Sequence, residues 1–179
     1  MTIKIDADDV FQRLRFLFDT QKLIIVRGAP GSGKTTFANR LLNRCPTSVK
    51  TGRGIVHWEN DQFFMKNGKY EWSRERLSEA IEWCNNQVVQ SLMRGATVIV
   101  ANTFIKHVHM AELINAADSF GIPQVVFRMT GEHKDIHNVP RDIVENMRAN
   151  MEEYEYEILT PGFDSKDGLT LEIPNEYIP

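Results

Sequence analysis

The chain has 179 residues, of which 42% are hydrophobic and 25% are charged, and its net charge is −3 with histidine neutral. This composition predicts one globular domain over residues 1–179 and excludes a disordered chain, a collagen and a long coiled coil. The small acidic charge also excludes a protein that binds along duplex DNA through a basic surface, so any contact with nucleic acid must be local.

In chain order, the apolar pattern predicts helices and strands that alternate. A helix is expected over residues 6–18, a strand over 23–26, a helix over 34–44 and a strand over 55–58. After a turn at Asn67–Gly68, a helix is expected between its cap Ser73 and Gly95, followed by a strand over 97–101, a helix over 106–119 and a strand over 124–127. Pro140 opens a last helix, whose apolar side continues to Ile158, and a last strand is expected over 169–173. This order predicts an α/β fold with a mostly parallel sheet covered on both faces. The ligand site is then expected beyond the carboxyl ends of the strands.

The first residues of the chain, its apolar runs and its cysteines give expectations about the protein's location in the cell. The first residues, MTIKIDADDV, are acidic where a secretory signal is basic and then apolar. No apolar run approaches the roughly 20 residues of a membrane-spanning helix. We therefore expect a soluble cytoplasmic protein without membrane contact, in which Cys45 and Cys84 are reduced core thiols.

The segment after the first expected strand, GAPGSGKT, has the pattern G-x-x-x-x-G-K-[ST] and precedes a helix. Glycines in such a loop allow a tight turn, so consecutive N–H groups point into one concavity at the positive end of the helix. We predict that ATP binds here with Mg²⁺, with Lys34 on the β- and γ-phosphates and the Thr35 hydroxyl on the metal. The predicted nucleotide-binding residues are Gly28, Ala29, Pro30, Gly31, Ser32, Gly33, Lys34 and Thr35.

Other motifs separate the classes of P-loop protein. A switch GTPase carries an Asn-Lys-x-Asp run, which this sequence does not contain. An AAA-type motor needs acidic residues after a strand, but the matching strand ends Val100-Ala101-Asn102. The length also leaves little room for the extra subdomain of a motor, so a small kinase is the prediction that remains.

A kinase of this size needs a base for the acceptor hydroxyl and cations over the transferring phosphate. Asp61 follows the strand over 55–58 and is the predicted base, because it lies at the same sheet edge as the loop that carries Lys34. The lid is expected between the strand over 124–127 and the last helix. Its candidate cations are Arg128, Lys134 and Arg141.

Four segments, GAPGSGKTT, WENDQFF, VIVANTF and VPRDIVENMRANMEEYE, resemble the P-loop kinase domain of bacteriophage polynucleotide kinase and its small single-domain relatives. They occur in the family's order within residues 22–158, and residues 161–179 lie outside the match. The resemblance implies a three-layer P-loop NTPase fold with a helical lid, and transfer of phosphate from ATP to a 5′-hydroxyl of DNA or RNA. It also implies a host cytoplasm if the chain is phage-encoded.

Carried over by residue, the resemblance adds Thr36 to the loop and places the lid arginine on Lys134 and the family's acidic pair on Asn60-Asp61. The family's base is usually the first of that pair, an amide here, so either Asp61 takes the role or the acceptor differs. Asn102 stands where the family has an aspartate, and Phe63 where it has an arginine that reads the acceptor's phosphate. An aromatic there suits a stacked base or nucleoside.

These departures leave the acceptor open. A nucleic-acid hydroxyl is favoured, either at a 5′ end or, as in a related group of phage kinases, on the 5-hydroxymethyl group of 5-hydroxymethyluracil in DNA. A second hypothesis is a kinase of a nucleoside, a sugar or an antibiotic. A third is a protein that binds nucleotide without catalysis, which the missing carboxylates motivate. The oligomeric state is not predicted.

Overall fold

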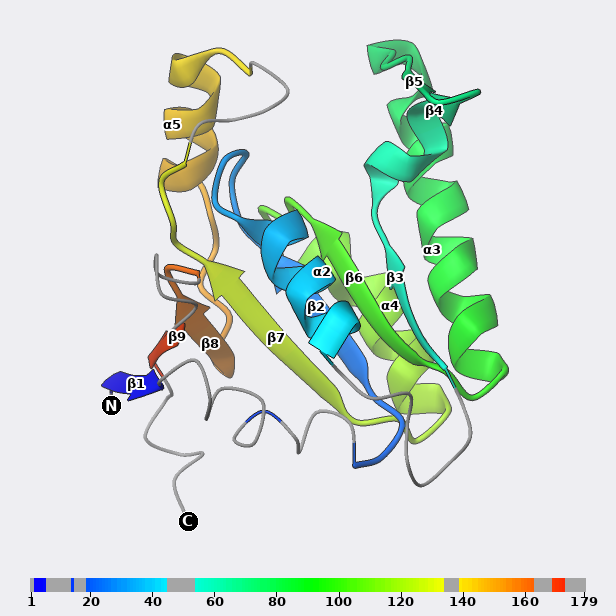
Figure 1. Ribbon diagram of the computed structural model, residues 1–179. Coiled ribbons are helices and arrows are strands. Elements are labelled where there is room, and N and C mark those ends of the chain that lie inside the picture. The colour runs from blue at the N-terminus through cyan, green and yellow to red at the C-terminus, as the bar shows by residue number, and fades with distance from the viewer. Residues whose placement is uncertain are drawn as a thin grey trace.

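The structure, a computed structural model, describes residues 2–5, 14, 19–44, 54–133, 139–162 and 169–172. In this part of the chain the main sheet has the strand order β1-β9-β8-β7-β2-β6-β3 (Figure 1). Strands β8, β7, β2, β6 and β3 are parallel, β9 is antiparallel to β8, and β1 is antiparallel to β9. The strand bounds are β1 Thr2–Ile5, β2 Leu23–Arg27, β3 Ile55–Trp58, β6 Thr97–Asn102, β7 Gln124–Met129, β8 Glu157–Thr160 and β9 Leu169–Glu172.

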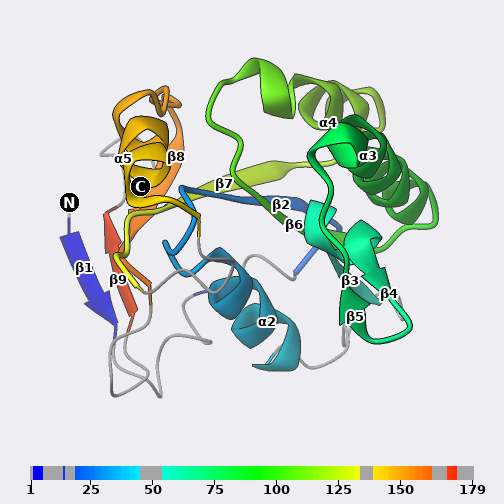
Figure 2. The ribbon, with the colours of Figure 1, turned by 90° about the horizontal axis from the view of Figure 1, so that it is seen from above.

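Helices cover both faces of this sheet. Helix α2 lies on one face, and α3 and α4 lie on the other (Figure 2). The helix bounds are α2 Lys34–Arg44, α3 Leu77–Met93, α4 Val108–Ser119 and α5 Arg141–Ala149, with short 3₁₀ helices η2 Asn60–Phe64 and η3 Arg74–Arg76. The fold is therefore the expected α/β fold of P-loop proteins. None of the described helices has the length and apolar character that a bilayer-spanning segment requires.

The central strand β2 explains how the layers are held together. All five of its residues are buried, and alternate side chains point to opposite faces of the sheet. Ile24 and Val26 pack in the cluster that contains Phe37 of α2, whereas Ile25 packs in the cluster that contains Cys84 of α3. Because β2 is buried on both sides, the loop that follows it is anchored to the core of the protein.

The parallel strands end at one edge of the sheet, and the connecting segments gather there (Figure 1). The loop between β2 and α2 lies in the middle of this edge. Helix α5 stands on one side of it, and η2 stands on the other with a small hairpin, β4 Met65–Lys66 and β5 Lys69–Tyr70. Asn67 and Gly68 turn this hairpin with φ of 49° and 78°, as the turn signal predicts.

Most of the expected elements are confirmed, including the strands over 23–26, 55–58, 97–101 and 124–127 and the last strand. The expected helix over 6–18 lies outside the described residues apart from Leu14. The helix that was expected to continue to Ile158 is wrong, because α5 ends at Ala149 and Ile158 lies in β8, paired with Phe127. Ser73 precedes η3 and its side chain makes no capping hydrogen bond, so it does not cap α3 directly.

Cys84, as expected, is a buried free thiol, and it gives a prediction about pH. Burial is the main cause that raises its pKa from 9.0 to about 11. Between pH 9 and 11 the folded thiol keeps a proton that the unfolded thiol loses, so stability falls as the pH rises through this window. Between pH 8 and pH 10 the free energy of unfolding should fall by about 1 kcal/mol more in the wild type than in Cys84→Ala. Urea unfolding under reducing conditions measures this, and equal slopes for both proteins would contradict it.

Candidate functional site

The loop between β2 and α2 has the backbone that its glycines were expected to provide. Gly28, Gly31 and Gly33 have φ of 152°, 74° and 93°, in the region that side chains with a Cβ disfavour. At Gly28 an added Cβ would lie 2.5 Å from the Ser32 hydroxyl oxygen and 2.7 Å from the carbonyl oxygen of Met129. Any larger residue at position 28 would therefore push the loop away from β7.

The chemistry of this loop fits a bound phosphate chain. The loop leads into the N-terminus of α2, where backbone N–H groups lack helical partners and the helix dipole favours anions. The first turn of α2 contains no acidic residue that would compete for these groups. The Ser32 hydroxyl is buried and has no hydrogen-bond partner in the described part of the chain. Lys34 Nζ donates to the Ala29 carbonyl oxygen over 2.9 Å, which holds the ammonium against the loop.

The hydroxyl of Thr35 is hydrogen-bonded to a carboxylate that is not among the site residues predicted from the sequence. Thr35 Oγ1 donates to Glu59 Oε2 over 2.9 Å. Glu59 follows β3 and is the N-terminal cap residue of η2, two positions before Asp61. This contact joins the loop to the end of β3, across β6, which lies between β3 and β2. A hydroxyl and a carboxylate are oxygen ligands that suit Mg²⁺, so this pair fits a magnesium ion that is shared with phosphates.

Asp61 lies in η2 at the sheet edge where it was expected, and it is partly exposed. Tyr70 of the β4–β5 hairpin donates a hydrogen bond of 2.8 Å from its hydroxyl to Asp61 Oδ1. Next to it, Phe63 packs against Trp83 with ring centroids 6.0 Å apart and carries the guanidinium of Arg76 4.7 Å from its ring centre. Asp61 is therefore bonded to the β4–β5 hairpin, and its segment η2 also carries Phe63 with its contacts to Trp83 and Arg76.

Asn102 and Phe104 mark the end of β6. Asn102 Oδ1 accepts the backbone N–H of Asn60 over 2.8 Å, and Asn102 Nδ2 lies 3.6 Å from the Sγ of Cys84. The carbonyl oxygen of Thr103 accepts the N–H of Gly28 over 3.2 Å. Phe104 has φ of 42°, which is strained for a residue with a Cβ. The end of β6 thus braces both the P-loop and η2.

A buried cluster of charges lies beside the loop on the β7 side. Glu157 of β8 accepts hydrogen bonds of 3.2 Å from Arg27 and from Arg128, one on each carboxylate oxygen. Arg27 is fully buried and also donates to the carbonyl oxygens of Ile105 and Glu152. Burial lowers the pKa of the Arg27 guanidinium, and Glu157 opposes this shift. Since two guanidinium groups share one carboxylate, these three side chains carry one net positive charge.

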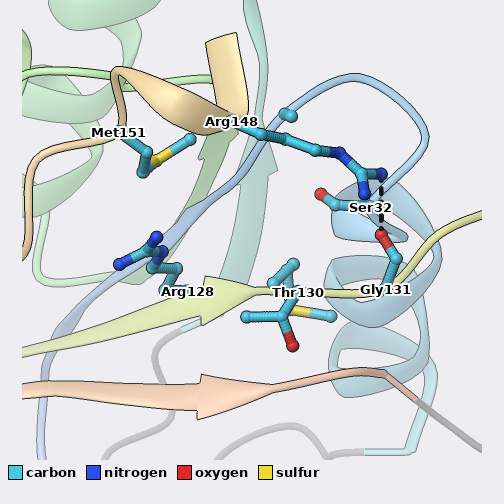
Figure 3. Close-up of a pocket in the computed structure, with 8 residues that line it drawn as sticks. Ser32, Arg128, Thr130, Gly131, Arg148 and Met151 are labelled. Atoms are coloured by element: carbon cyan, nitrogen blue, oxygen red, sulfur yellow. Dashed lines mark hydrogen bonds between the residues drawn. The ribbon is translucent and has the colours of Figure 1, made fainter. Parts of the chain in front are cut away.

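A pocket opens between the P-loop, β7 and the end of α5 (Figure 3). Arg148 reaches from α5 across this pocket and donates to the carbonyl oxygen of Gly131 over 3.2 Å, and it also pairs with Glu132. Gly131 permits a close approach here, because a Cβ would lie 2.8 Å from the Ser32 carbonyl oxygen. The lining residues are Ala29, Ser32, Arg128, Met129, Thr130, Gly131, Arg148 and Met151.

The predicted site residues are therefore only partly brought together. Arg128 lines the pocket beside Ala29 and Ser32, and Asp61 lies two residues after Glu59, which contacts Thr35. Thr36 is exposed on α2. Arg141 is 92% exposed and pairs with Glu145 along its own helix over 2.7 Å, away from the pocket lining. Lys134 lies outside the described residues.

Three groups at this site were not selected from the sequence as site residues: Glu59, Arg148 and the buried Arg27. Each acts through a contact with a segment far away in the chain. The signal that was available for Glu59 was its position directly after β3, two residues before Asp61. The segment 128–141 was expected to be a lid, and its described start is fixed to the P-loop, because the His133 N–H donates to the Gly31 carbonyl oxygen over 2.8 Å.

Comparisons with known proteins agree with this fold. The model of a family described as an AAA domain matches residues 23–136. An uncharacterized protein of Pasteurella multocida is 27% identical over 150 residues, which cover 79% of this chain and 83% of that protein. The Pnkp1/Rnl/Hen1 RNA repair complex contains a chain with a TM-score of 0.56 and 17% identity, and the match covers 74% of this chain and 44% of that one. A sugar kinase from Janibacter sp. HTCC2649 has a TM-score of 0.51 and 16% identity, with 78% and 84% covered. Identities this low show a common fold and not a common substrate.

Proposed function

The chain belongs to the AAA domain family and has a P-loop kinase-like fold, and from this premise we propose that it transfers the γ-phosphate of ATP to a hydroxyl group of a nucleic acid. One contact carries the proposal. The Thr35 hydroxyl is hydrogen-bonded to Glu59, so the segment that bears the candidate base Asp61 is attached to the phosphate-binding loop. A phosphate-binding loop and a carboxylate at one sheet edge are the parts that a hydroxyl kinase needs.

The proposed reaction assigns a role to each group. The acceptor oxygen bonds to the γ-phosphorus while the bond from that phosphorus to the bridging β,γ-oxygen breaks, and ADP leaves. The proton of the acceptor hydroxyl passes to the Asp61 carboxylate. The backbone of Gly28–Thr35 and the Lys34 ammonium hold the phosphates, and the positive charge of the Arg27–Glu157–Arg128 cluster favours the anionic substrate on that side. Mg²⁺, when bound with ATP, neutralises part of the phosphate charge. Lys134 is the proposed lid cation.

The surface beyond Asp61 supports a nucleic-acid acceptor. We call it the hairpin patch, and it comprises the exposed side chains of Met65, Lys66, Lys69, Tyr70, Trp72, Arg74, Leu77 and Ile81. Residues 65–76 contain four cations and two carboxylates, in a chain whose net charge is −3. Exposed aromatic rings next to cations are what single-stranded nucleic acid requires, since bases stack on rings and phosphates pair with cations.

The acceptor is tested by transfer of labelled phosphate to a panel of compounds. A single-stranded oligonucleotide with a 5′-hydroxyl should be labelled, and its apparent affinity should fall as salt rises, with a slope of about −0.7 for each phosphate contacted. Because stacking on a ring is worth about 1–3 kcal/mol, Trp72→Ala should raise the KM for the oligonucleotide about 5- to 150-fold and leave the KM for ATP unchanged. Phe120→Ala, which removes an exposed ring at the far end of α4, is the matched control.

The same panel separates the alternatives. Labelling of DNA with hydroxymethylated bases without labelling of the 5′-hydroxyl would keep the nucleic acid as acceptor and move the acceptor hydroxyl to a base. Labelling of free nucleosides or sugars without labelling of any nucleic acid would replace the proposed acceptor and leave the phosphotransferase intact. Binding of ATP with no labelled product for any acceptor would contradict the phosphotransferase itself.

A further inference from the structure

The carboxylate nearest to the P-loop hydroxyl comes from the end of β3 and not from β6. In P-loop NTPases the loop's serine or threonine holds Mg²⁺ together with an aspartate at the end of a neighbouring strand. The strand next to β2 on this side is β6, and Asn102 stands at its end. An amide carries no negative charge, so it cannot supply what that aspartate supplies.

Both polar atoms of the Asn102 side chain already have partners within the protein. Its side chain is 8% exposed, its Oδ1 accepts the backbone N–H of Asn60, and its Nδ2 faces the Sγ of Cys84. With these two contacts Asn102 ties β6 to η2 and α3. A hard cation at the Thr35 hydroxyl therefore needs its protein carboxylate from a different element.

Glu59 is held in a position where its carboxylate can serve a cation at the Thr35 hydroxyl. Its backbone is extended, with φ of −149° and ψ of 152°, and Gln62 closes a capping box on it by accepting the Glu59 N–H over 3.4 Å. The Gln62 amide also donates to the His57 carbonyl oxygen over 3.2 Å, which fixes the end of β3. The next residue, Asn60, donates its backbone N–H to Asn102, so Glu59 lies in the segment that is bonded to the end of β6.

We propose that Glu59 supplies the carboxylate of the Mg²⁺ site, in place of an aspartate at position 102, and that Thr35 and the nucleotide phosphates complete it. Thr35 uses its proton to bond Glu59, so the lone pairs of its oxygen stay available to a cation. Among the described residues no group of three or more His, Cys, Asp or Glu is placed to hold a metal ion by protein ligands alone. A site with one carboxylate, one hydroxyl and substrate phosphates agrees with how Mg²⁺ is usually bound beside nucleotides.

The inference rests on the proposed function, because the metal arrives with the nucleotide, and it is tested by binding alone. A fluorescent ATP analogue is titrated into the protein in EDTA and then at increasing Mg²⁺ concentration. In the wild type Mg²⁺ should tighten binding. Glu59→Gln should raise the Mg²⁺ concentration needed about 10- to 100-fold, and its affinity for the metal-free analogue should stay within about twofold of the wild type.

Asp61→Asn is the matched control, since it removes a carboxylate two residues away and should leave the Mg²⁺ titration unchanged. Adding Asn102→Asp to Glu59→Gln should recover part of the loss by returning a carboxylate to β6. If Glu59→Gln does not fold, Glu59→Asp decides, because it keeps the charge and shortens its reach, and the Mg²⁺ requirement should rise at least threefold.

Each outcome has a defined meaning. If the Glu59→Gln variant needs the same Mg²⁺ concentration as the wild type, this inference is overturned, and nucleotide binding by the P-loop is unaffected. The same holds for Glu59→Asp where that variant is the one used. A wild type that binds the analogue equally well with and without Mg²⁺ would also overturn it. A wild type that binds no analogue at all would instead contradict the proposed function.

Discussion

Lys34→Ala is expected to lower the rate of phosphoryl transfer by about 10²–10³-fold and to weaken ATP binding. Removal of a single donor that stabilises developing charge in a water-poor site typically has an effect of this size, about 3–4 kcal/mol. The Lys34 ammonium lies against the carbonyl oxygen of Ala29 within the loop, where the phosphates are proposed to bind. Transfer is measured with saturating acceptor, and binding is measured with the fluorescent ATP analogue.

Two further variants make this result specific. Lys34→Met keeps the aliphatic stem, so it should match Lys34→Ala if the charge is responsible. Lys106→Ala removes an exposed lysine near the start of α4 and should leave both rate and binding at wild-type values. Wild-type affinity in Lys34→Ala would remove the basis of the proposed function.

The P-loop could be predicted from the sequence because its determinants are local. A buried strand, glycines at positions with positive φ, and a lysine and a threonine at the start of a helix all lie within 13 consecutive residues, 23–35. The central strands were also predictable, since β2 and β6 contain continuous apolar runs, Leu23–Val26 and Val98–Ala101, which are typical of strands buried on both faces.

The end of the last helix was not predictable by the same reasoning. Met147, Met151, Tyr154 and Ile158 have helical spacing, yet the chain leaves the helix after Ala149. Pairing of β8 with β7 buries Ile158 and places Glu157 between Arg27 and Arg128, and this tertiary pairing outweighs the local pattern. The partners of Glu157 lie 29 and 130 residues away in the sequence, so the helical spacing of the apolar residues could not reveal this pairing.

The site was predictable to the level of its segments but not of all its contacts. The sheet edge was identified from the strands and the segment 58–64 from its motif, but which acidic side chain meets Thr35 depends on how β3, β6 and β2 are aligned. The sequence favoured Asp61 as the base for the acceptor and predicted no carboxylate beside Thr35, whereas the structure brings Glu59 to Thr35 and Tyr70 to Asp61. The two carboxylates of this segment therefore face different partners, so their roles are separable by experiment.

Asp61→Asn should reduce kcat by about 10²–10⁴-fold, the usual contribution of a general base, while the Mg²⁺-dependent affinity for nucleotide stays within about twofold of the wild type. The substitution is nearly isosteric and leaves an oxygen that can still accept the Tyr70 hydroxyl, so the hairpin should keep its place. Single-turnover transfer to the acceptor measures the chemical step without a contribution from product release.

The contrast with Glu59→Gln makes the assignment testable. If Glu59 serves the metal and Asp61 serves the acceptor, Glu59→Gln is rescued in part by raised Mg²⁺ and Asp61→Asn is not. Glu71→Gln, which neutralises an exposed carboxylate of the same hairpin region, should turn over like the wild type. A kcat for Asp61→Asn within about threefold of the wild type would show that Asp61 does not accept the proton. Recovery of kcat at high Mg²⁺ would show the same, because a residue that only holds the metal becomes less important when the metal is in excess.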